Sequence, residues 1–219
     1  MNYDGFISTL IKRSEQLLMR GSHDDLSVTR RLLLMNTGFA LVHDRIRFWD
    51  DSDRLWKKVK GARKKKLKNS VTVDGQEFFE QFRTCEDWDY FKIETKDSSG
   101  KLTAHNVGRV LKGEEPRPRD EITLDSVWRA LRNSFAHGGI LPMSWGQADE
   151  IGIETEKRQT GCRDEIDRVY FVSKWTSEDN KQLGWKIIEF GLPALDAFWH
   201  DWCELLLASE QLDQLDQAA

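Results

Sequence analysis

The sequence has little cysteine, little proline and no long apolar run, and each shortage excludes a class of protein. Three cysteines, far apart and odd in number, support neither a disulfide framework nor a zinc knuckle. Four prolines and 15 glycines among 219 residues exclude collagen-like and low-complexity chains. No stretch approaches the roughly 20 apolar residues of a membrane span, and the charged segment 1–21 is unlike a signal peptide. We therefore expect a cytoplasmic protein without a membrane partner.

Basic residues are concentrated in one segment. Nine basic residues and one acid between Asp53 and Lys68 give this segment a net charge of +8, although the whole chain carries −4. Such a segment in an acidic chain suits a localised polyanion contact, and a solvated helix face is the alternative. If the partner is RNA, we expect the segment to contact its backbone through Lys57, Lys58, Arg63, Lys64 and Lys65.

Helical periodicity dominates the chain. The clearest helix starts at Thr123 or Asp125 and stops at Gly138-Gly139. Its apolar residues recur at i, i+3, i+4, i+7 and i+11, namely Leu124, Val127, Trp128, Leu131 and Phe135. Further helices are expected over 6–21, 26–49 and 54–68, and a last one from Pro193, with Trp199 and Trp202 in the core.

Val71 to Val73 could form a short strand, and clearer period-two alternation follows late in the chain, first at Ile151 and Ile153 and then at Val169, Phe171 and Trp185. The predicted fold is therefore mainly α. It is an up-and-down helical bundle with a small antiparallel β-hairpin or meander inserted before the C-terminal helix. We expect one domain over 1–219, with the β insertion at about 147–190 and a flexible acidic tail at about 209–219.

Familiar catalytic and metal motifs are missing. Gly108 and Gly113 have the spacing of a phosphate-binding loop, but Glu114 and Glu115 occupy the positions of its Lys and Ser/Thr and would repel phosphate. The five histidines are dispersed, and none has a second His or Cys at i+3 or i+4. The sequence therefore nominates no metal site and no cofactor.

One motif does carry chemical information, and it lies at the end of the clearest helix. The run is Leu131-Arg132-Asn133-Ser134-Phe135-Ala136-His137-Gly138. An Arg followed by four residues and a His, with a polar residue just after the Arg, resembles the signature of the HEPN superfamily. The predicted helical bundle is similar to the fold of that superfamily, and the β insertion is similar to its plasmid-encoded and ApeA-like branches.

The resemblance implies a metal-independent endoribonuclease that acts as a toxin or an antiviral defence effector. It implies that Arg132 and His137 carry the cleavage with support from Asn133, and that two copies pair their motifs in a homodimer. A nucleotidyltransferase-like antitoxin is the protein partner that it implies. The alternative is a non-catalytic HEPN-like helical module that binds a protein or nucleotide partner.

Helix geometry constrains how the three residues can cooperate. At 100° per residue, Asn133 and His137 form an i, i+4 pair on the open face, whereas Arg132 lies on the flank. Arg132 must therefore reach around the helix, or the last turn must unwind, or a second copy must complete the site. The non-catalytic interpretation is that His137 caps the helix C-terminus and Arg132 pairs with an acid.

Overall fold

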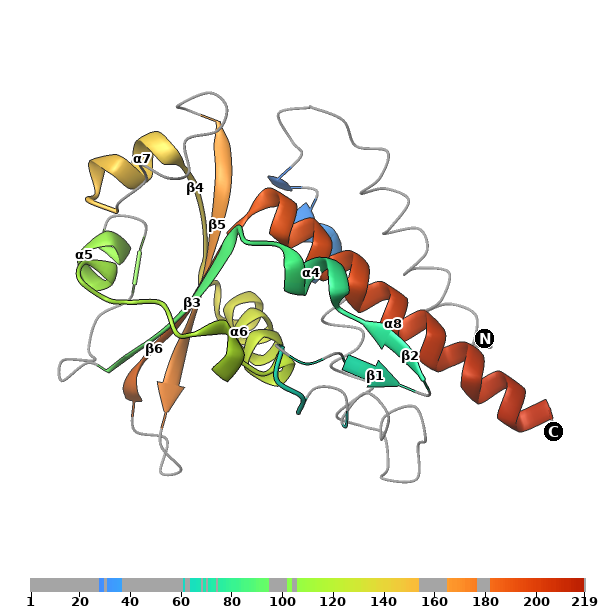
Figure 1. Cartoon of the computed structure of the whole chain (residues 1–219). Helices are drawn as coiled ribbons and strands as arrows, with labels where there is room; N and C mark the ends of the chain where they lie inside the picture. The colour runs from blue at the N-terminus through green and yellow to red at the C-terminus, as the bar shows by residue number, and fades with distance from the viewer. Residues whose placement is uncertain are drawn as a thin grey trace. The chain divides into compact units, whose positions relative to one another are not determined.

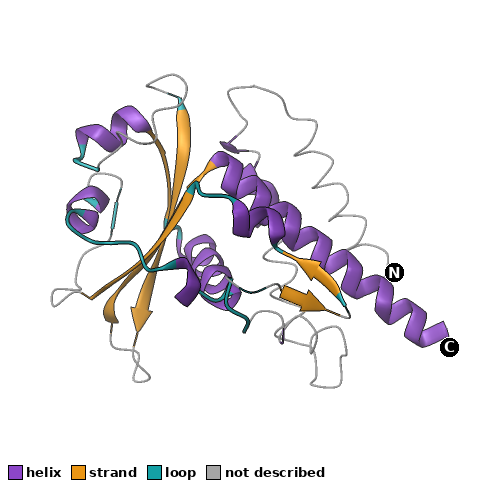
Figure 2. Ribbon diagram, viewed as in Figure 1, coloured by secondary structure: helices purple, strands orange, loops and turns teal. Residues whose placement is uncertain are grey.

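The computed structural model describes residues 28–29, 31–36, 61, 64–67, 69, 71–73, 75–94, 102–103, 106–153, 165–176 and 182–218 (Figures 1 and 2). The elements are, in chain order, β1 Val71–Val73, β2 Gln76–Phe78, α4 Glu80–Thr84, β3 Trp88–Glu94, α5 Val107–Leu111, η1 Arg119–Glu121 (a 3-10 helix), α6 Leu124–His137, β4 Ile140–Ser144, α7 Trp145–Glu150, β5 Ile166–Thr176, β6 Gln182–Gly191 and α8 Leu192–Ala218.

The chain divides into two compact units. The sheet unit comprises Glu86–Ile122 and Ser126–Ala194. The terminal unit comprises the described residues within Met1–Cys85, Thr123–Asp125 and Leu195–Ala219. Among the described residues, no helix combines the length and hydropathy needed to cross a membrane.

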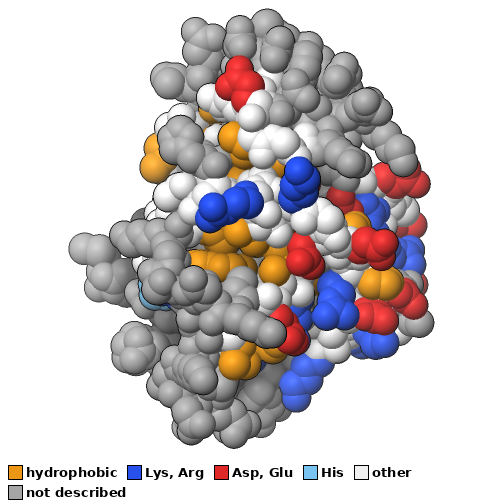
Figure 3. All heavy atoms as spheres, turned by 90° about the vertical axis from the view of Figure 1, so that its left-hand side faces the viewer, with side chains coloured by type: hydrophobic (Ala, Val, Ile, Leu, Met, Phe, Trp, Pro, Cys, Tyr) orange, Lys and Arg blue, Asp and Glu red, His pale blue; other side chains and the backbone are white. Residues whose placement is uncertain are grey.

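The sheet unit is built on a four-stranded antiparallel sheet in the order β3-β6-β5-β4. One face carries a buried apolar cluster that includes Phe91, Tyr170 and Ile187, and α5 and α7 add Val107 and Ala148 to it. Both helices lie on the same side of the sheet in Figure 1. Figure 3 views this side and shows hydrophobic side chains near its centre, with charges of both signs interspersed towards one edge.

Helix α6 covers the opposite face of the sheet (Figure 1). The ring centroids of Phe135 and Phe171 are 5.5 Å apart, and Phe171 continues the aromatic stack to Phe190 at 5.8 Å. Val127 and Leu131 of α6 are fully buried. With both faces of the sheet covered, β5 and β6 are buried along most of their lengths.

The terminal unit packs short elements against the part of α8 that begins at Leu195. Phe79 and Phe82 contact Phe198, with ring centroids 5.8 and 5.1 Å apart, and Phe79 also contacts Trp202. The Phe82 backbone N–H donates to the buried Asp201 carboxylate at 2.8 Å. Trp202 is fully buried, as predicted, and so is nearly all of Trp199.

The prediction of a mainly helical bundle is wrong, because the chain contains a four-stranded and a two-stranded antiparallel sheet. Strands β3 and β4 come from outside the segment 147–190 predicted as the β insertion. In β3 the adjacent residues Tyr90 and Phe91 are both buried, one on each covered face of the sheet. The strand therefore lacks the alternation of apolar and polar residues by which a half-exposed strand is recognised. Strand β4 contains Pro142, which an edge strand tolerates.

Other elements differ from the predictions in informative ways. Lys64–Leu67 is not helical, so the helix predicted over 54–68 does not reach Lys68, and the helix predicted over 6–21 lies outside the described residues. A strand was predicted around Ile151, but helix α7 lies just before this residue. Its start is fixed by a capping box, in which Ser144 and Gln147 each accept the backbone N–H of the other through a side-chain oxygen. Helix α6, the β5–β6 hairpin and the start of α8 are confirmed. Helix α8 continues to Ala218, through the segment predicted as a tail.

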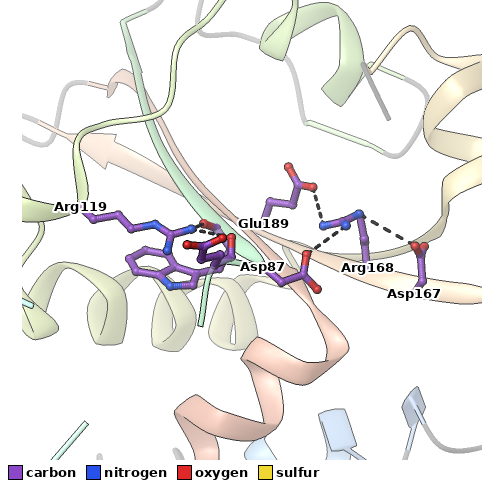
Figure 4. Close-up of polar contacts among 7 residues, drawn as sticks. Asp87, Arg119, Asp167, Arg168 and Glu189 are labelled. Atoms are coloured by element: carbon purple, nitrogen blue, oxygen red, sulfur yellow. Dashed lines mark hydrogen bonds and ion pairs between the residues drawn. The ribbon is translucent and has the colours of Figure 1, made fainter. Parts of the chain in front are cut away.

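Arg168 ties three segments of the sheet unit together (Figure 4). Its guanidinium is 3.0 Å from carboxylate oxygens of both Glu189 on β6 and Asp87 just before β3. The Arg168 and Glu189 side chains are each only 4% exposed. On the other side of β3, Arg119 donates to the backbone oxygens of Glu86 and Trp88. Because Arg168 and Glu189 are buried against each other, we assign the Arg168 cluster to structure rather than to catalysis.

We predict that Arg168→Met lowers the free energy of unfolding by about 3–5 kcal/mol, because it leaves the buried Glu189 carboxylate without its partner. Lys174→Met on the same strand is the control, since Lys174 is exposed and its loss should change stability by about 0.5 kcal/mol or less. Urea denaturation of both variants measures the difference. Equal effects would show that the buried pair contributes nothing specific.

Candidate active site at the end of helix α6

Helix α6 presents the motif in its last two turns. Leu124, Val127 and Leu131 are fully buried and fix the rotation of the helix. The helix ends at His137, and Gly138 adopts the left-handed conformation with φ +67°. The Gly139 N–H then donates to the Ser134 carbonyl at 2.8 Å, as in a Schellman motif. The end of the helix was therefore predicted correctly from its glycines.

Arg132 contacts Asn133 and Trp128. Its Nε donates to Asn133 Oδ1 at 2.9 Å, and its Nη2 donates to the same oxygen. The guanidinium carbon lies 5.9 Å from the ring centroid of Trp128, which is 2% exposed. The bonds to Asn133 hold the guanidinium beside that residue, and Trp128 lies one turn earlier on the buried side of the helix. Which of the three solutions brings Arg132 together with His137 stays a prediction.

His137 stands one helical turn beyond Asn133 and is exposed. Residues four apart share a helix face, so the Asn133 side chain, with the guanidinium bound to it, lies on the face that carries His137. The structure thus joins Arg132 and Asn133 directly, and helical spacing sets the exposed His137 one turn beyond Asn133. A cation and an imidazole that reach the same phosphodiester can act on it together.

The chain that leaves α6 is anchored to the sheet by close backbone contact. Val172 N–H donates to the Gly139 carbonyl at 2.7 Å. A Cβ on Gly139 would lie 2.0 Å from the Val172 carbonyl oxygen, which no side chain can tolerate. By contrast, nothing lies within 4 Å of a Cβ placed on Gly138. Gly138 is therefore needed for its left-handed backbone conformation, and Gly139 is needed because no side chain fits beside Val172.

We predict that Gly139→Ala lowers the melting temperature much more than Gly138→Ala does. Alanine at position 138 pays only the cost of the left-handed conformation, about 1–2 kcal/mol. Alanine at position 139 must in addition push β5 away from the helix end. Thermal denaturation of the two variants measures this difference, and equal losses would contradict the steric account.

The predicted RNA-backbone residues are placed only in part. Lys57, Lys58 and Arg63 lie outside the described residues. Lys64 and Lys65 are exposed, and Lys65 Nζ donates to the Thr72 carbonyl at 3.3 Å. The Leu124 N–H donates to the Lys65 carbonyl at 3.2 Å. Lys65 is thus joined to the first residue of α6, whereas Arg132 and His137 occupy its last turns.

One group of residues has donor atoms close enough to hold a metal, within the part of the chain that the structure describes. Donor atoms of His200, Asp201 and Glu204 on α8 all lie within 4.8 Å of one another. However, the Asp201 carboxylate already accepts the Phe82 backbone N–H. Burial raises the pKa of Asp201, and the Phe82 N–H and the His200 charge only partly oppose that effect. Because the Asp201 carboxylate is buried and already bonded to the Phe82 backbone, we assign Asp201 to packing.

We predict that Asp201→Asn removes part of the pH dependence of folding. The folded state binds the Asp201 proton more tightly than the unfolded state, where its pKa is close to 3.8. Stability from this group is therefore fully present below pH 3.8 and declines as the pH rises through the raised pKa. Asparagine keeps an acceptor for Phe82 and cannot ionise, so the variant should gain stability relative to wild type as pH rises. Urea denaturation from pH 3.5 to 7 measures this, and parallel profiles would contradict it.

No protein-family model, curated protein or solved structure matches the chain.

Proposed function

We propose that the protein is a metal-independent endoribonuclease whose site is formed by Arg132, Asn133 and His137. The observation that carries the proposal is the bond from the Arg132 guanidinium to Asn133, on the face that His137 shares. The proposal rests on this local arrangement and on the resemblance of the motif to HEPN proteins. It does not rest on a helical-bundle fold, which the chain lacks.

The reaction uses the RNA's own nucleophile. The 2′-oxygen attacks the adjacent phosphorus, and the bond from phosphorus to the 5′-oxygen breaks. The products end in a 2′,3′-cyclic phosphate and a 5′-hydroxyl. One group must take the proton of the 2′-hydroxyl, and another must give a proton to the leaving 5′-oxygen. DNA lacks the 2′-hydroxyl and is not cut.

Each residue has a distinct role in this mechanism. The exposed imidazole of His137 transfers protons, and a second His137 from a partner copy in a homodimer supplies the complementary transfer. The Arg132 guanidinium stabilises the charge that builds on the phosphate oxygens. Asn133 is a positioning residue, because its side-chain oxygen holds the guanidinium. A cytoplasmic toxin or defence effector, controlled by an antitoxin of the nucleotidyltransferase type, is the setting in which we place this activity.

We predict that the purified protein cleaves labelled RNA in EDTA and leaves the matched DNA intact. His137→Ala should slow the cleavage by about 10²–10⁴-fold, the usual contribution of a general acid–base. Arg132→Ala should slow it by about 10²–10³-fold, as expected for the loss of a group that stabilises transition-state charge. Gel analysis of the fragments, with identification of the cyclic phosphate, measures rate and chemistry together.

Arg129→Ala is the matched control, because Arg129 is an exposed arginine one turn earlier on the same helix. It should cleave at the wild-type rate. If the folded wild type cleaves none of several RNAs, the proposal is wrong and a non-catalytic module that binds a protein or nucleotide becomes the better account. Cleavage that EDTA abolishes would also contradict it.

A further inference from the structure

A polar pocket of about 260 Å³ lies within the sheet unit. It is lined by residues from β3, β6, α6 and the segment around η1, including Tyr90, Lys92, Arg117, Glu121, Ser126 and Lys186. Three of these six side chains are cationic and one is acidic. This excess of positive charge stands out in a chain whose net charge is −4.

Two of the cations face each other directly. Lys92 on β3 and Lys186 on β6 are register partners in adjacent antiparallel strands. Directly opposite residues in such a pair have Cβ atoms about 4.5–5.5 Å apart, and like charges there are destabilising. Arg117 adds a third positive charge to the same pocket. The pocket therefore gathers three cations from two strands and from the segment just before η1.

The pocket is held in shape by contacts that leave its cations in place. Lys92 Nζ lies 3.8 Å from the ring centroid of Trp175, which fixes the direction of the lysine. The Arg117 backbone N–H donates to the Tyr90 carbonyl at 2.8 Å, so the arginine is tied to the exposed edge of β3. Because these side chains are already held in place, binding of an anion would cost less of their conformational entropy.

The donors suit a tetrahedral oxyanion. Burial raises the pKa of Tyr90 to about 12, with the Arg117 charge opposing it, so the phenol keeps its proton at neutral pH. Tyr90 and Ser126, which carry hydroxyls, line the pocket together with Lys92, Lys186 and Arg117. Guanidinium and ammonium groups are the side chains that bind phosphate in proteins.

We infer that this pocket binds a phosphate group, carried either by a small phosphate ester or by an RNA strand. The volume suits one phosphate with part of its sugar rather than a large ligand. The inference is independent of the proposed nuclease, because the pocket shares no residue with Arg132, Asn133 and His137.

The test is a titration of the full chain at constant ionic strength, followed by calorimetry and thermal denaturation. The probes are inorganic phosphate, a 5′-mononucleotide and a short RNA, with chloride as the reference salt. Wild type should bind phosphate saturably, and its melting temperature should rise with phosphate concentration. Lys186→Gln and Arg117→Gln should each weaken binding at least tenfold, whereas Lys112→Gln, at an exposed lysine outside the pocket, should not change it.

Stability in chloride alone gives a second readout. Lys186→Gln should melt close to the wild-type temperature, because glutamine keeps a long polar side chain at this half-buried position, so its weaker binding cannot be ascribed to misfolding. Binding of RNA without binding of phosphate or mononucleotide, if lost in Lys186→Gln, identifies an RNA phosphate as the ligand. The inference is overturned if no probe binds saturably, or if Lys112→Gln weakens binding as much as the pocket variants do.

Discussion

The close contact between the backbones of Gly139 and Val172 fixes where helix α6 ends on the sheet. The two residues share a hydrogen bond of 2.7 Å, and the space beside Gly139 admits no side chain. The buried residues of α6 set the rotation of the helix about its axis. The contact between Gly139 and Val172 sets where the last turn of the helix lies on the sheet. Arg132, Asn133 and His137 occupy that turn and the one before it. The direction in which the motif points is therefore a property of the sheet unit and not of the helix alone.

The same helix relates the motif to the phosphate pocket. Ser126 lines the pocket near the start of α6, and His137 ends the helix 11 residues later, about 16 Å away along the axis. Both positions belong to the sheet unit. The helix crosses the sheet from the side of Tyr90 on β3 to the side of Phe171 and Gly139. One helix thus lines the cationic pocket near its start and carries Arg132, Asn133 and His137 in its last two turns.

Elements with one clear local pattern of apolar residues could be predicted from the sequence. The apolar stripe of α6 and the two glycines after it gave both ends of the helix, and the β5–β6 hairpin followed from its alternation. It failed for β3, because adjacent residues are buried on opposite covered faces of the sheet. The pairing of Lys92 with Lys186 was missed for a different reason, because it exists only across two strands that are far apart in the sequence. The capping box of Ser144 and Gln147 was a legible signal that could have revealed α7.

We propose that Arg132 and Asn133 act as one unit beside His137. A double-mutant cycle on RNA cleavage tests this most directly. The rate on one RNA is measured for wild type, Arg132→Ala, Asn133→Ala and the double variant. If Asn133 works only by holding the guanidinium, the double variant cleaves no more slowly than Arg132→Ala. Losses that multiply in the double variant would show that the two residues act independently, contrary to this account.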